Sequence, residues 1–142
     1  MDRISREKRS KNMSAIQSAS TKPEMLVRRY LRHNGVFYRC NVKNLPGRPD
    51  IAIKKFRLAL NVHGCFWHGH QNCKNFRLPK TNIEFWKAKI EANMLRDEKT
   101  RESLLALGYQ YWEVWECELL RNDFAQLDDF VKSYRRVRSI VQ

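Results

Sequence analysis

The sequence predicts one mixed α/β domain, because segments with helical and strand-like patterns alternate along the chain. A length of 142 residues with 42% hydrophobic residues is enough to build a single core. The sequence contains no repeat, low-complexity tract or interdomain linker. We therefore expect residues 1–20 to form a basic N-terminal arm, residues 21–134 the folded domain, and residues 135–142 a basic C-terminal tail.

A first helix is expected to begin at Thr21. Thr21 is a favourable N-cap, Pro23 falls in the first turn, and Glu24 completes a capping-box pattern. Gly35 is typical of the position just after a helix end.

Three short strands are predicted next, over residues 36–42, 50–53 and 56–62. Short turn-forming segments separate them, so we expect an antiparallel meander. Cys40 in the first of these strands has no histidine nearby and is assigned to the core.

The second half of the chain predicts a helix, a strand and a helix. Thr81 and Glu84 form a second capping-box pattern, and the helix that they open extends to Leu107 and ends at Gly108. Residues 109–115 are rich in aromatics and predict a strand. Apolar side chains at helical spacing then mark a C-terminal helix: Phe124, Leu127, Phe130, Val131 and Tyr134.

The charge balance favours a polyanionic partner. Lys and Arg number 28 against 15 Asp and Glu, which gives a net charge of +13 and a pI near 10.0. No apolar run approaches the roughly 18 residues of a membrane-spanning helix. Residues 1–11 are charged with no apolar stretch behind them, so they predict a basic arm and not a signal peptide. We expect a nucleic-acid-binding protein of the cytoplasm, associated with the nucleoid.

Residues 63–73 crowd histidines, cysteines and aromatics just after an apolar strand. Asp50 begins the neighbouring predicted strand, so its carboxylate and the imidazoles are expected to meet. Asp50 alone could be an ordinary turn residue, and His68 alone an ordinary loop residue. Together they indicate a hydrolytic site.

Thiolates close to histidines indicate metal binding more than disulfide formation. Cys65, His70 and Cys73 fall on one loop, and Cys117 at the end of a later strand could complete a tetrahedral set. Such soft ligands favour zinc, and a full protein ligand set implies a structural ion. The alternative is that Cys65 and Cys117 are small buried hydrophobes and His70 is a polar loop residue.

Several separated motifs occur in a fixed order: RSKNM (9–13), LPGRPD (45–50), HGCFWH (63–68), FW (85–86) and VWEC (114–117). Together they resemble the very short patch repair endonucleases, the Vsr-type nickases of T:G mismatches, over nearly the whole chain. The resemblance implies a restriction-endonuclease-like fold, with a central mixed sheet flanked by helices. It also implies Mg²⁺-dependent hydrolysis of one DNA strand on the 5′ side of the mismatched thymine.

The resemblance also implies roles for individual residues. Asp50 matches the catalytic aspartate that binds Mg²⁺, and Val62 matches a position whose main-chain carbonyl is a further Mg²⁺ ligand. His68 matches the catalytic histidine, which can take a proton from the attacking water. His63 matches a second active-site histidine, expected to assist at the phosphate or leaving group, and Glu24 matches an acidic residue near the metal waters.

The structural zinc set of the family matches the four residues derived above. The loop between His70 and Cys73 is one residue longer than in the family, so His68 is an alternative zinc ligand. The aromatic wedge that the family inserts into the base stack matches three residues: Phe66, Trp67 and Trp86. Neighbours on a helix cannot face the same way, so we assign Phe85 to the core.

The partners that the resemblance implies are duplex DNA with a T:G mismatch, a cytosine-5 DNA methyltransferase whose product deaminates to thymine, and mismatch-repair proteins. An asymmetric lesion needs one active site, so a monomer is expected. Two other functions fit part of the sequence. One is a restriction-like or mobile-element endonuclease of the same fold, and the other is a noncatalytic zinc-stabilised DNA-binding protein.

Overall fold

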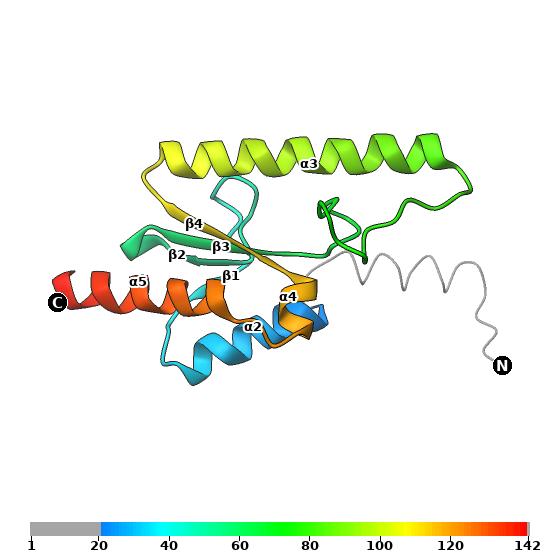
Figure 1. Ribbon diagram of the computed structural model, residues 1–142. Coiled ribbons are helices and arrows are strands. Elements are labelled where there is room, and N and C mark those ends of the chain that lie inside the picture. Colours follow the sequence, from blue (N-terminus) through cyan, green and yellow to red (C-terminus); the bar gives the residue numbers. More distant parts are fainter. Residues whose placement is uncertain (1–20, 142) are drawn as a thin grey trace, which may run out of the picture.

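The fold is built around a mixed sheet of four strands in the order β1-β2-β3-β4. The computed structural model describes residues 21–141, which form a mixed α/β domain with helices on both faces of this sheet (Figure 1). The elements in chain order are α2 (Lys22–His33), β1 (Arg39–Cys40), β2 (Ile51–Ile53), η1 (Lys54–Phe56), β3 (Leu58–His63), α3 (Ile83–Ala106), β4 (Gln110–Trp115), α4 (Glu116–Leu120) and α5 (Ala125–Val141).

Helix α2 confirms the predicted start. The Thr21 hydroxyl accepts a hydrogen bond from the Glu24 N–H at 3.5 Å, which satisfies one of the free N–H groups of the first turn. Gly35 follows the helix with a φ of +75°, a conformation that side chains rarely adopt. Val27 and Leu31 on this helix are completely buried against the sheet and α5.

The sheet combines antiparallel and parallel pairing. Strands β1, β2 and β3 pair antiparallel, as the predicted meander requires. Helix α3 then carries the chain over one face, so β4 returns parallel to β3. In this register His63 lies opposite Trp115, at the carboxyl ends of β3 and β4. The same end of the sheet receives Asp50, which directly precedes β2.

Three expectations for the sheet region were wrong. The first strand is limited to two residues, and Cys40 within it is exposed and not in the core, because β1 is a short strand at the edge of the sheet. Phe56 belongs to the turn η1 and not to β3. Arg57 follows η1 with a φ of 56°, so the chain cannot extend as a strand until Leu58.

Helix α3 begins as predicted near residue 82 but without the expected cap. Asn82, and not Thr81, is the N-cap residue, and its left-handed backbone makes no side-chain capping bond. Gly108 ends the segment with a φ of +85°. A side chain at Gly47 would lie 2.4 Å from Thr100 of α3, so a glycine there lets the loop before β2 approach the helix closely.

The main core lies between the sheet and helices α2 and α5. Phe130 and Leu127 of α5 are completely buried there, and Phe130 packs edge-to-face on Trp112. This confirms the predicted apolar face of the C-terminal helix. The helix continues to Val141, so the basic positions from Arg135 onward extend α5 in place of the expected tail. No helix within residues 21–141 is long and apolar enough to cross a membrane.

The opposite face of the sheet, under α3, is mostly polar near the site. Its apolar cluster is small and centres on Ala59, Leu104 and Tyr109. Side chains alternate along a strand, so Asn61 and His63 of β3 share a face, as do the neighbouring residues Tyr111, Glu113 and Trp115 of β4. This polar layer leads to the candidate site.

Candidate active site and metal centre

Asp50 is bound to β3 at two points. Its N–H donates to Oδ1 of Asn61 at 2.8 Å, and its Oδ2 accepts from the N–H of Val62 at 2.7 Å. Burial raises the pKa of Asp50 to about 6, although the Val62 hydrogen bond opposes that shift. The carboxylate of Glu24 also raises this pKa, whereas His68 lowers it. Glu24 and His68, the residues predicted to act with Asp50, therefore both influence its carboxyl group electrostatically.

Glu24 points inward from the first turn of α2. The residue is only 8% exposed, and its carboxylate lies 3.7 Å from the guanidinium of Arg28, one turn later. Its carboxylate acts electrostatically on Asp50 and raises the pKa of that group. The Glu24 N–H therefore donates to the Thr21 cap, while its carboxylate acts electrostatically on Asp50.

His63 and His68 stack on each other at this end of the sheet. Their ring centroids lie 4.0 Å apart, and the ring planes differ by 4°. His68 Nδ1 lies 2.7 Å from Oδ2 of Asp97 on α3, so a carboxylate orients this ring. Burial and the neighbouring His68 lower the pKa of His63 to about 3, which keeps His63 neutral at physiological pH.

The stacked geometry argues against a metal ion shared by these histidines. Ligand atoms of His63, His68 and Asp97 lie within 4.8 Å of one another. A histidine nitrogen binds a metal along a direction in its own ring plane, so two parallel stacked rings cannot both aim at one ion. The hydrogen bond between His68 and Asp97 instead suits proton transfer.

Asp97 was missed in the sequence, although a signal for it existed. Residues 90, 97 and 104 are spaced by seven along α3, and Ile90 and Leu104 are buried. A carboxylate midway along such an inward stripe needs a polar partner, and His68 is that partner.

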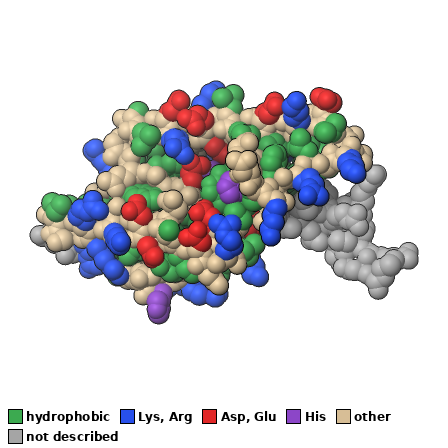
Figure 2. Space-filling view, in the orientation of Figure 1, with side chains coloured by type: hydrophobic (Ala, Val, Ile, Leu, Met, Phe, Trp, Pro, Cys, Tyr) green, Lys and Arg blue, Asp and Glu red, His purple; other side chains and the backbone are tan. Residues whose placement is uncertain are grey.

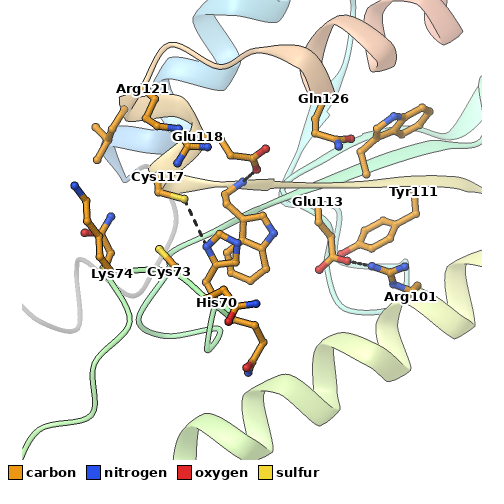
Figure 3. A pocket seen from close by; sticks show the side chains of 16 residues that line it. His70, Cys73, Lys74, Arg101, Tyr111, Glu113, Cys117, Glu118, Arg121 and Gln126 are labelled. Atoms are coloured by element: carbon orange, nitrogen blue, oxygen red, sulfur yellow. Dashed lines mark hydrogen bonds and ion pairs between the residues drawn. The ribbon is translucent and has the colours of Figure 1, made fainter.

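Arg101 and Glu113 were also missed. Glu113 on β4 forms an ion pair with Arg101 of α3, and its other oxygen lies 3.2 Å from His63 Nδ1. That contact has poor hydrogen-bond geometry, and His63 Nδ1 has no hydrogen-bond partner among the described residues. No local motif predicts these contacts, because they depend on how α3 crosses β4 (Figure 3).

The predicted soft-ligand set converges on one point. The ligand atoms of these residues lie within 4.8 Å of one another: Cys65, His70, Cys73 and Cys117. Figure 3 shows His70, Cys73 and Cys117 turned toward one another, and Cys117 Sγ lies 3.5 Å from His70 Nδ1. Cys117 lies in the first turn of α4, one element later than the expected strand end. His70 is the histidine in this group, because His68 faces Asp97.

The loop reaches this arrangement through two residues with positive φ. Asn72, between His70 and Cys73, has a φ of 56°, in the left-handed region that asparagine tolerates. Gly69 has a φ of +61°, and a side chain there would lie 2.8 Å from both Ile90 and Met94 of α3. The His70 ring stacks on Trp115 with centroids 3.9 Å apart. These contacts hold the loop against α3 and β4.

The residues of this cluster fit a tetrahedral soft cation. Burial raises the pKa of Cys65 to about 12, so its thiol would remain protonated without a nearby positive charge. A thiolate is the form that binds a metal, and the cation itself supplies the stabilising charge. The cluster can therefore hold a metal ion.

An aromatic group lies beside these two clusters. Phe66, Trp67 and Trp86 contact one another, with centroids 5.1 Å apart for the first two and 5.8 Å apart for the two tryptophans. All three rings are partly exposed. The assignment of Phe85 to the core was wrong: it is 60% exposed and packs against the edge of Trp86, because this end of α3 extends past the sheet.

The chain has clear relatives. A family model described as DNA mismatch endonuclease Vsr matches residues 1–75. The chain is 46% identical to the Type II nicking enzyme V.XorIIP of Xanthomonas oryzae pv. oryzae, over 83% of this chain and 86% of that protein. It is 46% identical to the Type II nicking enzyme V.NmeAIP of Neisseria meningitidis, over 79% of each chain. It is 41% identical to the DNA mismatch endonuclease Vsr of Escherichia coli, over 78% of this chain and 70% of that protein. The chain therefore belongs to the Vsr family of DNA mismatch endonucleases, which are DNA-hydrolysing enzymes.

Proposed function

We propose that this DNA endonuclease nicks one strand of duplex DNA on the 5′ side of the thymine in a T:G mismatch, and so initiates very short patch repair. The observation that carries the proposal is that Asp50 is hydrogen-bonded to Val62, next to His63, whose ring stacks on the His68 of the His68–Asp97 pair. The Escherichia coli relative, named for mismatch cleavage, supports the choice of substrate. The central mixed sheet between helices also supports our assignment to the restriction-endonuclease-like class.

Asp50 and Val62 would hold Mg²⁺, the former by its carboxylate and the latter by its main-chain carbonyl. These hard oxygen donors suit Mg²⁺, and the hydrogen bond from the Val62 N–H to Asp50 keeps residue 62 beside the carboxylate. Glu24 is a second, largely buried acid that acts electrostatically on Asp50, and it would bind metal-associated water. When bound, Mg²⁺ would supply positive charge that stabilises the negative charge developing on the phosphate.

His68 would act as the general base. If Nδ1 donates its proton to Asp97, the other nitrogen, Nε2, is the acceptor for a proton from water. That water oxygen then forms a bond to phosphorus while the bond from phosphorus to the leaving oxygen breaks. Asp97 would position the ring and stabilise the imidazolium that forms.

His63 would support His68 from behind. Its side chain is only 3% exposed, which limits contact with a phosphate, and its lowered pKa leaves no imidazolium proton to donate near neutral pH. Its parallel ring instead covers one face of His68. We therefore assign His63 a positioning role, in place of direct assistance at the leaving group.

The other two clusters would serve the same reaction. Zinc at the Cys₃His cluster would be structural, because all four positions of a tetrahedral ion are filled by protein. Phe66, Trp67 and Trp86 would insert into the base stack beside the mismatch. Unstacking costs a few kcal/mol per base step and is cheapest where a mispair already distorts the helix, so the wedge favours mismatched DNA.

The cellular setting follows from the substrate. A T:G mismatch arises when 5-methylcytosine loses its amino group, so the functional partner would be a cytosine-5 DNA methyltransferase with the same sequence preference. Mismatch-repair proteins would act on the nicked product. A lesion in one strand requires one active site, so we expect a monomer in the cytoplasm, associated with the nucleoid.

The proposal is tested by removing the charge of Asp50. Asp50→Asn should abolish Mg²⁺-dependent nicking of a T:G duplex and leave DNA affinity close to that of the parent chain, because phosphate contacts and the wedge remain. Asp123→Asn, an exposed carboxylate on the loop before α5, is the matched control and should nick normally. Normal nicking by Asp50→Asn would remove Asp50 from the mechanism.

A further inference from the structure

Asn61 is a buried polar residue in the middle of a strand whose other described side chains are mainly apolar. It lies in β3, between Leu60 and Val62, and is 9% exposed. Asparagine is disfavoured in strands, and a buried amide is costly unless both of its ends are hydrogen-bonded. The hydrogen bonds of the amide indicate why asparagine occupies this position in the sheet.

Both ends of the Asn61 amide are used. Oδ1 accepts from the N–H of Asp50 at 2.8 Å, and Nδ2 donates to the hydroxyl of Tyr111 on β4 at 2.9 Å. The orientation of the amide is determined, because a main-chain N–H can only donate and must therefore face the oxygen. Tyr111 fixes the other end of the amide from the neighbouring strand.

The Asn61 side chain binds the main chain of Asp50 just beyond the last residue pair between β2 and β3. Ile51 pairs with Leu60 at the start of β2, so Asp50 and Asn61 are the next residues along each strand. There the N–H of Asp50 is bound by the Asn61 side chain, while the Asp50 carbonyl accepts from Asn41 at 3.1 Å. With the bond from Val62 to the carboxylate, both the main chain and the side chain of Asp50 are held.

We propose that Asn61, anchored by Tyr111, is a positioning residue that holds Asp50 in the geometry required for its metal ion. The inference rests on the proposed role of Asp50 as a Mg²⁺ ligand. Mg²⁺ demands near-ideal octahedral geometry, so a small displacement of a carboxylate weakens binding. Hydrogen-bond partners of ligating groups commonly change metal affinity by about 10-fold to 100-fold. Asn61 binds the main chain of Asp50 and leaves the carboxylate oxygen Oδ1 without a bond to this amide.

The test compares Asn61→Leu, Tyr111→Phe and the double variant with the parent chain. Mn²⁺ binding without DNA, followed by electron paramagnetic resonance, gives a midpoint that does not depend on catalysis. We expect Asn61→Leu to raise this midpoint about tenfold, and Tyr111→Phe to raise it less. The double variant should match Asn61→Leu, because the hydroxyl acts only through the amide. The Mg²⁺ midpoint for T:G nicking should shift in parallel.

Leu127→Ala is the matched control for lost stability. Leu127 is completely buried on the opposite face of the sheet, so its truncation should lower the unfolding temperature without moving the Mn²⁺ midpoint. An unchanged midpoint in Asn61→Leu, with unfolding lowered as in Leu127→Ala, would reduce Asn61 to a purely structural residue. Loss of Mn²⁺ binding in Asp50→Asn but not in Asn61→Leu would reject this inference and spare the proposed function. Absence of binding in the parent chain would reject both.

Discussion

The Asp50 carboxylate must be ionised to bind a metal ion, but its burial favours the protonated form. Burial raises its pKa to about 6, so protons and metal ions compete for the same group near physiological pH. Glu24 adds to the competition, because its carboxylate repels that of Asp50 when both are ionised. A divalent cation relieves both penalties at once.

This competition predicts how nicking depends on pH. Asp50 has a folded-state pKa above its ordinary value, so it is increasingly protonated below about pH 6 and loses its affinity for Mg²⁺. The single-turnover rate should therefore fall as pH drops through about 6, and higher Mg²⁺ should move that fall to lower pH. Rates measured at several Mg²⁺ concentrations between about pH 5 and about pH 8 check this. An acid limb that does not move with Mg²⁺ would assign the titration to another group.

Asp97 gives a second prediction at the level of single residues. Asp97→Asn keeps the shape but removes the acceptor charge that orients His68, so we expect kcat to fall by about 100-fold with little change in DNA affinity. Glu91→Gln, an exposed acid on the same helix, is the control and should have parent activity. Parent-like turnover by Asp97→Asn would separate His68 from its assigned partner.

Sequence patterns identify residues well when the chemistry lies in one segment. Asp50, His68 and the cysteine loop were predicted from short motifs; in the structure Asp50 binds Val62 beside the stacked His63 and His68, and the ligand atoms of the cysteine loop gather with Cys117. Asp97 could not be paired with His68 in the same way, since 29 residues separate them and only the crossing of α3 joins them. The assignment of Cys40 to the core was wrong for a related reason: burial depends on tertiary packing, and Cys40 is exposed on the edge strand β1.

At the scale of elements, the cysteine loop connects parts of the fold that are distant in sequence. It follows β3, packs on α3 through Gly69, and meets Cys117 at the start of α4. His68 and the aromatic pair 66–67 lie on this same loop. A metal at its base would therefore fix the position of the candidate base and of the wedge together.

The Cys₃His cluster predicts that the purified protein contains bound zinc. Protein purified without chelators should contain about one zinc ion per chain. Cys73→Ser should lose the ion, lower the unfolding temperature by about 10 °C or more, and reduce nicking, because the loop carrying His68 loses its anchor. Cys40→Ser, an exposed cysteine outside the cluster, should change none of these. Elemental analysis that finds no zinc in the parent chain would refute the four-ligand assignment.

The elements that were predicted correctly carry strong local signals. Helix α2 has an N-cap, and α5 has an apolar stripe at helical spacing. The sequence did not predict the short length of β1 or the turn η1. The length of β1 depends on tertiary pairing, and η1 is followed by Arg57 with a positive φ. The predicted cap of α3 was wrong, because Thr81 and Glu84 match the capping-box sequence but do not form that structure.

At the scale of the whole molecule, the net charge of +13 favours a polyanionic partner. On the face shown in Figure 2, acidic side chains lie both along α3 and across the middle, and Lys and Arg side chains lie among them as well as along the edges. The Lys and Arg side chains could bind phosphates of a DNA backbone. We further propose that residues 1–20, outside the described range, act as a basic arm on the DNA.

Salt dependence tests this arrangement. Neutralising the five basic residues of the arm (Arg3, Arg6, Lys8, Arg9 and Lys11 to Gln) should weaken DNA binding and reduce the slope of log affinity against log salt. Each lost phosphate contact should change the slope by about 0.9. The control neutralises Lys54 and Lys55 in η1, at the opposite end of the sheet from the site, and should leave the slope unchanged. Equal effects in both variants would mean that the arm has no special role.

The central claim is tested most directly by strand-resolved cleavage of end-labelled duplexes with Mg²⁺. T:G, T:A and C:G are compared at one position within a pool of flanking sequences. We predict a single nick just 5′ of the mismatched thymine, with the paired controls intact, and the cleaved members of the pool would reveal the preferred context. Cutting of both strands in fully paired DNA would contradict the proposal and indicate a restriction-like endonuclease.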